Sequence, residues 1–251
     1  ALVELRARFD EQNNIDWSKQ LESAGCTVIY GSEGFKCHSK ICQLTYREGM
    51  ALTRLTLLGT GNFNEKTATL YADCGLFTCR KEIVADLYNL FRTLQGKEDP
   101  KFTTLLVARF NLIPELNRLI DREISLADEG KQGRIILKMN ALQDPAMIDR
   151  LYEASEHGVQ IDLIVRGICC VRAGVPGKTE NLHIRSLVGR YLEHGRIYSF
   201  YDGVNTRIYI ASGDFLTRNT ECRVEVGVRV EDPVLKEKLD SILRLQLSDN
   251  V

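Results

Sequence analysis

The sequence has no apolar run long enough to cross a membrane, and its charges almost cancel. A membrane-spanning helix needs about 18 or more consecutive apolar residues, and no such run occurs among the 251 residues. The formal net charge is −1, so the overall field does not favour a general binder of polyanions. Any anion site must therefore come from local clusters of arginine and lysine.

Paired C-x-x-C spacing, a common sign of a zinc site, is also absent, although the chain has eight cysteines. Most of them lie in apolar, strand-like surroundings, and no secretory signal is found. Reduced thiols are therefore favoured over disulfides. We expect a cytoplasmic protein, with peripheral contact to the inner membrane as an alternative. The chain starts at Ala1 inside an apparent strand, so we expect a fragment of a longer polypeptide.

Strands and helices alternate along the chain, which predicts an α/β fold with mixed sheets. A linker rich in Gly, Pro and charge at 95–101 divides it into expected domains at 1–98 and 99–251. In the first domain we expect a strand pair at 40–46 and 52–58 and a helix at 82–94. In the second we expect strands at 105–107, 134–138, 160–165, 196–201, 207–210 and 223–230, and helices at 113–128, 145–157, 186–191 and 233–247.

Two similar histidine motifs are the most informative feature. His38-Ser39-Lys40 precedes an apolar strand pattern and the turn Gly59–Asn64, and His194-Gly195-Arg196 precedes another strand pattern and the turn Ala211–Phe215. Each half thus offers an imidazole, a cation two residues later and a turn of small residues with one polar side chain. If the two halves face each other, they predict a single phosphate-handling site.

His38 is the candidate nucleophile, because a largely neutral imidazole can attack phosphorus. Lys40 lies on the same side of a strand and can neutralise phosphate oxygens. Asn62 can donate its amide to the same oxygens or orient the ring. A strand-end histidine beside a solvated lysine is the simpler interpretation, but the second copy of the motif argues against it.

His194 is the candidate partner, protonating a leaving oxygen or holding the phosphate from the opposite face. Asp214 replaces the asparagine of the first half and could orient His194 or another basic group. Arg8 and Arg166 follow strand ends, where α/β folds place ligand contacts, and arginine binds phosphate with a forked set of donors. Tyr71 could stack on a base or bond a phosphate, although core packing explains it equally well.

No Walker A motif, kinase glycine-rich loop or Rossmann fingerprint is present. The half-sites instead resemble the phospholipase-D-like superfamily, with H-x-K followed by a G-[ST]-x-N type of turn. A closer resemblance is to one branch, the C-terminal domains of the histidine-phosphorylating bacterial polyphosphate kinases. It spans nearly the whole chain and is carried by the segments 3–11, 36–40, 58–68, 164–170 and 191–196.

This resemblance implies two phospholipase-D-like domains related by a pseudo-twofold axis, the first of them N-terminally truncated. It also implies an enzyme that reversibly transfers the terminal phosphate of ATP to inorganic polyphosphate through phosphorylated His38. His194, Arg166 and Tyr71 match residues that contact ATP, and Arg8 matches one associated with Mg²⁺. The implied partners are ATP, ADP and polyphosphate, in a homo-oligomer of the full-length protein, without nucleic acid.

Two alternatives remain open from the sequence. One is a phospholipase-D-like phosphodiesterase or nuclease, although the acidic residue of that pattern, five positions after the lysine, is Thr45 here. The other is a non-catalytic fragment that binds nucleotide or polyphosphate without a complete site.

Overall fold

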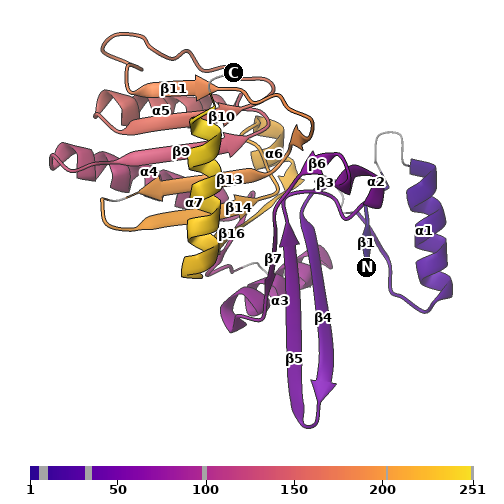
Figure 1. The fold of residues 1–251 in the computed structure, drawn as a ribbon. Coiled ribbons are helices and arrows are strands. Elements are labelled where there is room, and N and C mark those ends of the chain that lie inside the picture. Colours follow the sequence, from indigo (N-terminus) through magenta and orange to yellow (C-terminus); the bar gives the residue numbers. More distant parts are fainter. Residues whose placement is uncertain (6–10, 32–35, 98–100, 202, 250–251) are drawn as a thin grey trace.

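A mixed sheet of seven strands forms the centre of the second half (Figure 1). The computed structural model describes residues 1–5, 11–31, 36–97, 101–201 and 203–249. β10 is parallel to β9 and β11, and the other neighbours are antiparallel. In spatial order the strands are β11 (Leu182–Arg185), β10 (Gln160–Val165), β9 (Arg134–Met139), β13 (Arg196–Tyr201), β14 (Thr206–Ala211), β16 (Val226–Val230) and β8 (Leu105–Val107).

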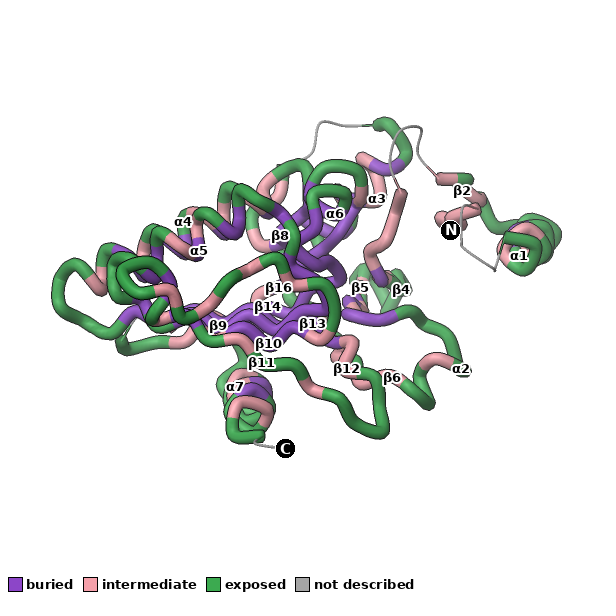
Figure 2. The backbone as a smooth tube through the Cα atoms, turned by 90° about the horizontal axis from the view of Figure 1, so that it is seen from above, coloured by how far each residue is buried: buried purple, intermediate pink, exposed green. Residues whose placement is uncertain are grey.

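Helices cover both faces of this sheet (Figures 1 and 2). α4 (Leu112–Asp128) and α5 (Pro145–Glu156) lie on one face, and α7 (Pro233–Leu247) lies on the other. Successive strand residues point to opposite faces, so Tyr198 belongs to the core beneath α4 and α5, whereas its neighbour Ile197 belongs to the core beneath α7. The expected α/β fold is confirmed.

The first half has a smaller antiparallel sheet of β4 (Lys40–Glu48), β5 (Ala51–Gly59) and β7 (Gly75–Thr78). Its parallel pair, β1 (Leu2–Val3) and β2 (Ile29–Tyr30), is joined by α1 (Glu11–Ser23) and is separate from that sheet in the described residues. β1 and β2 have only two residues each, whereas the mixed sheet of the second half uses longer, buried strands. The β4–β5 hairpin extends away from the core (Figure 1) and is largely exposed.

α3 (Lys81–Leu94) connects the two halves. Leu87 and Leu90 on its apolar face are fully buried in the core beneath α7. The buried side chain of Asp86 accepts hydrogen bonds from the backbone N–H groups of Thr103, Thr104 and Leu105, at 2.8, 2.6 and 2.9 Å. One carboxylate thus fixes the start of β8 against α3.

Replacing Asp86 with alanine is expected to lower the free energy of unfolding by about 2–4 kcal/mol, because three backbone donors lose their acceptor. Urea unfolding followed by circular dichroism measures this loss. Asp149→Ala, at an exposed position of α5, is the matched control and should change stability by less than about 0.5 kcal/mol. Equal losses in the two variants would contradict the clamping role of Asp86.

Two expectations for the second half are wrong. The segment 186–191 contains no helix; Leu187 packs against the core but Val188 is 95 % exposed, so the segment has too little core contact to stabilise a helix beside Gly189. The expected strand 223–230 is divided at Glu225 into β15 (Arg223–Val224) and β16. The unpredicted short elements are β3 (Lys36–Cys37), β6 (Tyr71–Ala72), β7, β11, β12 (Leu192–Glu193), α2 (Glu65–Ala68) and α6 (Thr217–Glu221).

The helices in the described part of the chain include none that is both long enough and apolar enough to cross a membrane.

Candidate active site

Two short parallel strand pairs join the halves reciprocally. β3 pairs with β15, and β12 pairs with β6. Because β3 and β12 directly precede the two histidines, each histidine is anchored on the opposite half. The backbone N–H of His38 donates to the carbonyl of Val224, and that of His194 donates to the carbonyl of Ala72, both at 3.1 Å. The two motifs therefore meet at the junction of the halves (Figure 1).

A buried carboxylate orients the ring of His38. Nδ1 lies 2.9 and 3.0 Å from the two carboxylate oxygens of Glu225, whose residue is only 1 % exposed. The hydroxyl of Ser212 donates to the same carboxylate at 2.6 Å. Since an ionised carboxylate can only accept hydrogen bonds, the proton of the neutral ring resides on Nδ1. Nε2 then carries the lone pair, as an attacking nitrogen requires.

Burial and charge keep this ring neutral near pH 7. Burial lowers the pKa of His38, and Glu225 opposes that effect only in part. Burial on its own would raise the pKa of Glu225, but the hydrogen bonds from His38 and Ser212 and the charge of Lys40 hold that pKa below its usual value. The pair is therefore an unprotonated carboxylate beside a neutral imidazole.

Lys40 supplies a buried cation next to His38. It is 6 % exposed, and its ammonium group donates to the carbonyl of His38. Burial lowers the pKa of Lys40 to about 8, with the charges of Arg196 and Arg223 contributing in the same direction against the opposing effect of Glu225. At neutral pH the group is charged and poorly solvated, which favours a bound anion.

His194 has an equivalent arrangement in the other half-site. Its Nδ1 lies 2.8 Å from Oδ1 of Asp73, and the hydroxyl of Thr60 donates to that same oxygen at 2.6 Å. Burial would raise the pKa of Asp73, but the hydrogen bonds from His194 and Thr60 outweigh it and lower that pKa. The ring of Tyr71 packs against His194 with 5.0 Å between centroids.

Arg196 links the half-sites. Its guanidinium group donates to both carboxylate oxygens of the buried Asp214, at 3.1 and 3.2 Å. It also donates to the carbonyl of His194 at 2.9 Å and to the carbonyl of Thr60, in the other half, at 3.2 Å. Asp214 therefore holds Arg196 in place, and Arg196 is close enough to Lys40 to influence its pKa.

Arg166 belongs to the His194 half-site. Its Nε donates to the side chain of Asn140 and to the carbonyl of Glu193, both at 2.8 Å, so its position is coupled to β12, the strand directly before His194. Lys138 supports the same strand, with its buried ammonium 3.0 Å from the carboxylate of Glu193.

Two predicted site residues are not placed in this cluster. The side chain of Asn62 is exposed and forms no hydrogen bond among the described residues; only its carbonyl is used, as an acceptor from Asn64 N–H at 2.9 Å. Arg8 lies outside the residues that the structure describes. The structure does bring together His38, Lys40, Tyr71, Arg166 and His194 around the junction of the two halves.

The two carboxylates that hold the histidines are absent from the sequence-based predictions. A signal for them exists: Asp73 follows Thr60 by 13 positions, and Glu225 follows Ser212 by 13 positions. The glycines of the two turns show how closely each carboxylate approaches the backbone of its turn. A Cβ atom at Gly61 would lie 1.9 Å from the Asp73 carboxylate, and one at Gly213 would lie 2.9 Å from Cγ of Glu225. Only glycine leaves room for the carboxylates.

The acidic groups of the site do not suit a metal ion. Glu225, Asp73 and Asp214 are each already paired with His38, His194 or Arg196. In the ranges covered by the structure no group of three or more His, Cys, Asp or Glu residues could hold a metal. The described side chains thus offer a nucleophilic nitrogen and cations, which suit an anionic electrophile. They do not offer a set of protein ligands for a metal ion.

Comparisons with known proteins agree over the whole chain. The family model "Polyphosphate kinase C-terminal domain 1" matches residues 1–100, and "Polyphosphate kinase C-terminal domain 2" matches residues 105–251. The chain is 48% identical to polyphosphate kinase of Staphylococcus haemolyticus, with 99% of this chain and 35% of that protein covered. For polyphosphate kinase of Synechocystis the identity is 50%, with 99% and 34% covered.

A solved structure shares the fold. The crystal structure of polyphosphate kinase from Porphyromonas gingivalis superimposes with a TM-score of 0.89 at 44% identity, covering 99% of this chain and 41% of that one. The chain thus spans about a third of the length of the curated relatives that it matches. The matches to both C-terminal domain models, which together cover nearly every residue, show that this chain belongs to the polyphosphate kinase family.

Proposed function

We propose that this chain carries the phosphoryl-transfer site of an ATP:polyphosphate phosphotransferase, in which His38 accepts and returns the phosphate. The observation that supports this most is the His38–Glu225 pair, with Nδ1 held 2.9 Å from a buried carboxylate. This contact leaves Nε2 as the reactive atom. Lys40 and Arg196 add positive charge beside it, where the transferred phosphate would need it.

In the first step, Nε2 of His38 attacks the terminal phosphorus of ATP. A P–N bond forms as the bond from that phosphorus to the bridging oxygen breaks, and the bridging oxygen leaves with its electron pair on ADP. The ring becomes a phosphorylated imidazolium-like group whose Nδ1 proton remains hydrogen-bonded to Glu225. The carboxylate thereby stabilises the positive charge that develops on the ring.

In the second step, a terminal oxygen of polyphosphate attacks the phosphorus on His38. The P–N bond breaks, its electrons return to Nε2, and the polymer is one phosphate longer; the reverse sequence makes ATP. In this proposal His194 holds the transferred group from the opposite side, while Tyr71 and Arg166 contact the nucleotide. Positioning and charge do most of the catalysis, as in other phosphoryl transfers.

Magnesium is an expectation from the family resemblance, with Arg8 near it. Because the described carboxylates are already paired, no step above is routed through a metal ion. We further propose domains at 1–98 and 99–251, a cytoplasmic location, and a homo-oligomeric full-length protein.

The direct test uses ATP labelled in its terminal phosphate. The complete gene product should acquire a label that is stable to base and labile to acid, as a phosphohistidine is, and should lose it to ADP or to polyphosphate. The phosphodiesterase alternative instead predicts turnover of a chromogenic diester without ATP. A non-catalytic fragment would bind ATP without becoming labelled.

The rate of His38 labelling is expected to depend on pH with two limbs. The pKa of His38 is lowered, so the nucleophile stays unprotonated well into mildly acidic solution and the rate falls only at lower pH. The pKa of Lys40 is about 8, so its charge and the rate are lost as the pH rises through that value.

Single-turnover labelling across about pH 5 to 10 measures this profile. Lys40→Arg keeps the charge at all these values, and should therefore remove the alkaline limb without moving the acidic one. An unchanged alkaline limb in this variant would show that Lys40 is not the group responsible.

A further inference from the structure

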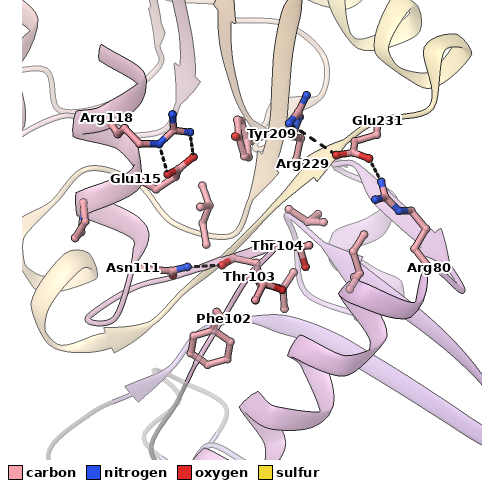
Figure 3. Close-up of a pocket in the computed structure, with 15 residues that line it drawn as sticks. Arg80, Phe102, Thr103, Thr104, Asn111, Glu115, Arg118, Tyr209, Arg229 and Glu231 are labelled. Atoms are coloured by element: carbon pink, nitrogen blue, oxygen red, sulfur yellow. Dashed lines mark hydrogen bonds and ion pairs between the residues drawn. The ribbon is translucent and has the colours of Figure 1, made fainter. Parts of the chain in front are cut away.

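A second cationic site lies between α3, β8, α4, β14 and β16, at some distance along the sheet from the histidines. It is a pocket of about 580 Å³ (Figure 3), and its lining includes none of His38, Lys40, Arg166 or His194. Tyr209 and Arg229, which face each other across β14 and β16, form part of its wall. The same strands lead to the turn at Ser212, so the pocket and the active site share one sheet.

Three arginines line this pocket: Arg80 directly before α3, Arg118 on α4 and Arg229 on β16. Arg80 pairs with Glu231, and Arg118 donates to both carboxylate oxygens of Glu115 at 2.6 and 2.7 Å (Figure 3). Arg229 approaches Glu231 no closer than 3.8 Å, and its buried Nε has no hydrogen-bond partner. Arg80 and Arg229 share Glu231, and Arg80 also lies 3.8 Å from the carboxylate of Glu82. Among the three, Arg229 therefore has the weakest acidic partner.

Arg207 and Arg122 extend the cluster beyond the pocket wall. Arg207 precedes Tyr209 by two residues on β14 and so lies on the same face, and Arg122 is one helical turn beyond Arg118 on α4. Among the residues that the structure describes, no acid pairs with Arg207. Burial lowers the pKa of Arg207, and the charges of Arg122, Arg229 and Arg118 lower it further.

Arg207 and Arg229 are held beside further arginines without a close acidic partner, and like charges held in this way indicate an anionic ligand. The aromatic groups of the pocket do not favour a nucleotide base: Tyr209 is only 4 % exposed, and the ring of Phe102 packs against Phe110 at 5.6 Å. Arg118 and Arg122 instead follow one another along α4, and Arg207 and Arg229 lie on the neighbouring strands β14 and β16. A linear anion with charge along its whole length matches this arrangement better than a nucleotide does.

We propose that Arg118, Arg207 and Arg229 bind a phosphoanhydride chain, namely a segment of inorganic polyphosphate, at a site separate from the histidines. This proposal rests on the proposed function, because it gives the polymer substrate a second point of attachment on the enzyme. Such a site would keep the polyphosphate bound to the enzyme while the end of the polymer leaves and re-enters the active site.

Protection of arginines from phenylglyoxal, mapped by mass spectrometry, tests the site directly. The complete gene product carrying His38→Ala would be modified with and without polyphosphate, tripolyphosphate, ATP or orthophosphate. At a polyphosphate concentration about ten times its Kd, modification of Arg207 and Arg229 should slow about tenfold. Arg47, exposed at the end of the β4–β5 hairpin, should react at an unchanged rate.

Protection by polyphosphate or tripolyphosphate would support the proposal. Protection by ATP alone would overturn it in favour of a nucleotide site, and unprotected arginines would overturn it outright. Arginines that fail to react even without a ligand would also overturn it, because the pocket would then be covered in the complete protein.

A double variant, Arg207→Gln with Arg229→Gln, should weaken polyphosphate binding about tenfold or more through the loss of charged hydrogen bonds. Its melting temperature should not fall, because like charges are removed, and Arg47→Gln should bind as the parent does. Labelling of His38 from ATP should persist in the double variant. Absent labelling in the parent would reject the proposed function, whereas labelling without arginine protection would reject only the second site.

Discussion

Alanine at position 38 is expected to abolish the acid-labile label that the protein acquires from ATP. The reason is that the P–N bond can form only at Nε2 of this ring, which Glu225 presents in the reactive tautomer. Loss of a covalent nucleophile lowers turnover by about 10⁴-fold or more in enzymes that depend on one. The label is measured by gel autoradiography after base treatment, and polymer synthesis by the incorporation of labelled phosphate.

The other histidines serve as controls. His157 ends α5 and pairs with Asp128 at the surface, and His183 is exposed on β11, so alanine at either position should leave labelling unchanged. Label that survives in His38→Ala, or that disappears in His157→Ala, would place the phosphate on another residue and end the proposal.

Glutamine in place of Glu225 is expected to slow labelling of His38 by about 10²- to 10⁴-fold. The amide oxygen can still accept the Nδ1 proton, so the ring keeps its orientation, but the negative charge that stabilises the phosphorylated ring is lost. The similar shape of the two side chains should preserve the fold, which near-ultraviolet circular dichroism checks. Labelling at the parental rate in Glu225→Gln would show that the contact is structural.

Asp73→Asn makes the same change in the other half-site and should have a different result. Asp73 holds His194, which we place beside the nucleotide, so the ATP concentration needed for half-maximal labelling should rise about tenfold. The labelling rate at saturating ATP should change much less than in Glu225→Gln. Identical effects of the two substitutions would contradict the division of roles between the half-sites.

The secondary structure was largely predictable, because it depends on short-range patterns. The helix at 233–247 and the strands at 160–165 and 196–201 have the expected bounds, since burial on one face imposes a period that the sequence displays. The expected helix at 186–191 does not form, because among these described residues Leu187 alone packs against the core and one apolar contact does not define a helical face. Two-residue strands such as β3 and β6 are too short to produce any periodic signal.

The candidate site was predictable only in part. His38, Lys40 and His194 were visible because the motif occurs twice, and their place at one junction agrees with the expectation of facing halves. Asn62 was expected to donate its amide to phosphate oxygens or to orient the ring of His38, but its side chain is exposed and Glu225 contacts that ring instead. The equivalence of the two turns therefore ends at their polar side chains.

The sequence by itself determined the two half-sites, the identity of each imidazole and cation, and most of the helices and strands, because these features involve residues close together in the chain. Only the tertiary structure decided which carboxylate holds which ring. Glu225 reaches His38 across 187 positions, and Asp73 reaches His194 across 121. Such pairs form because each short strand completes its hydrogen bonds on the opposite half, and no local pattern of residues records that exchange.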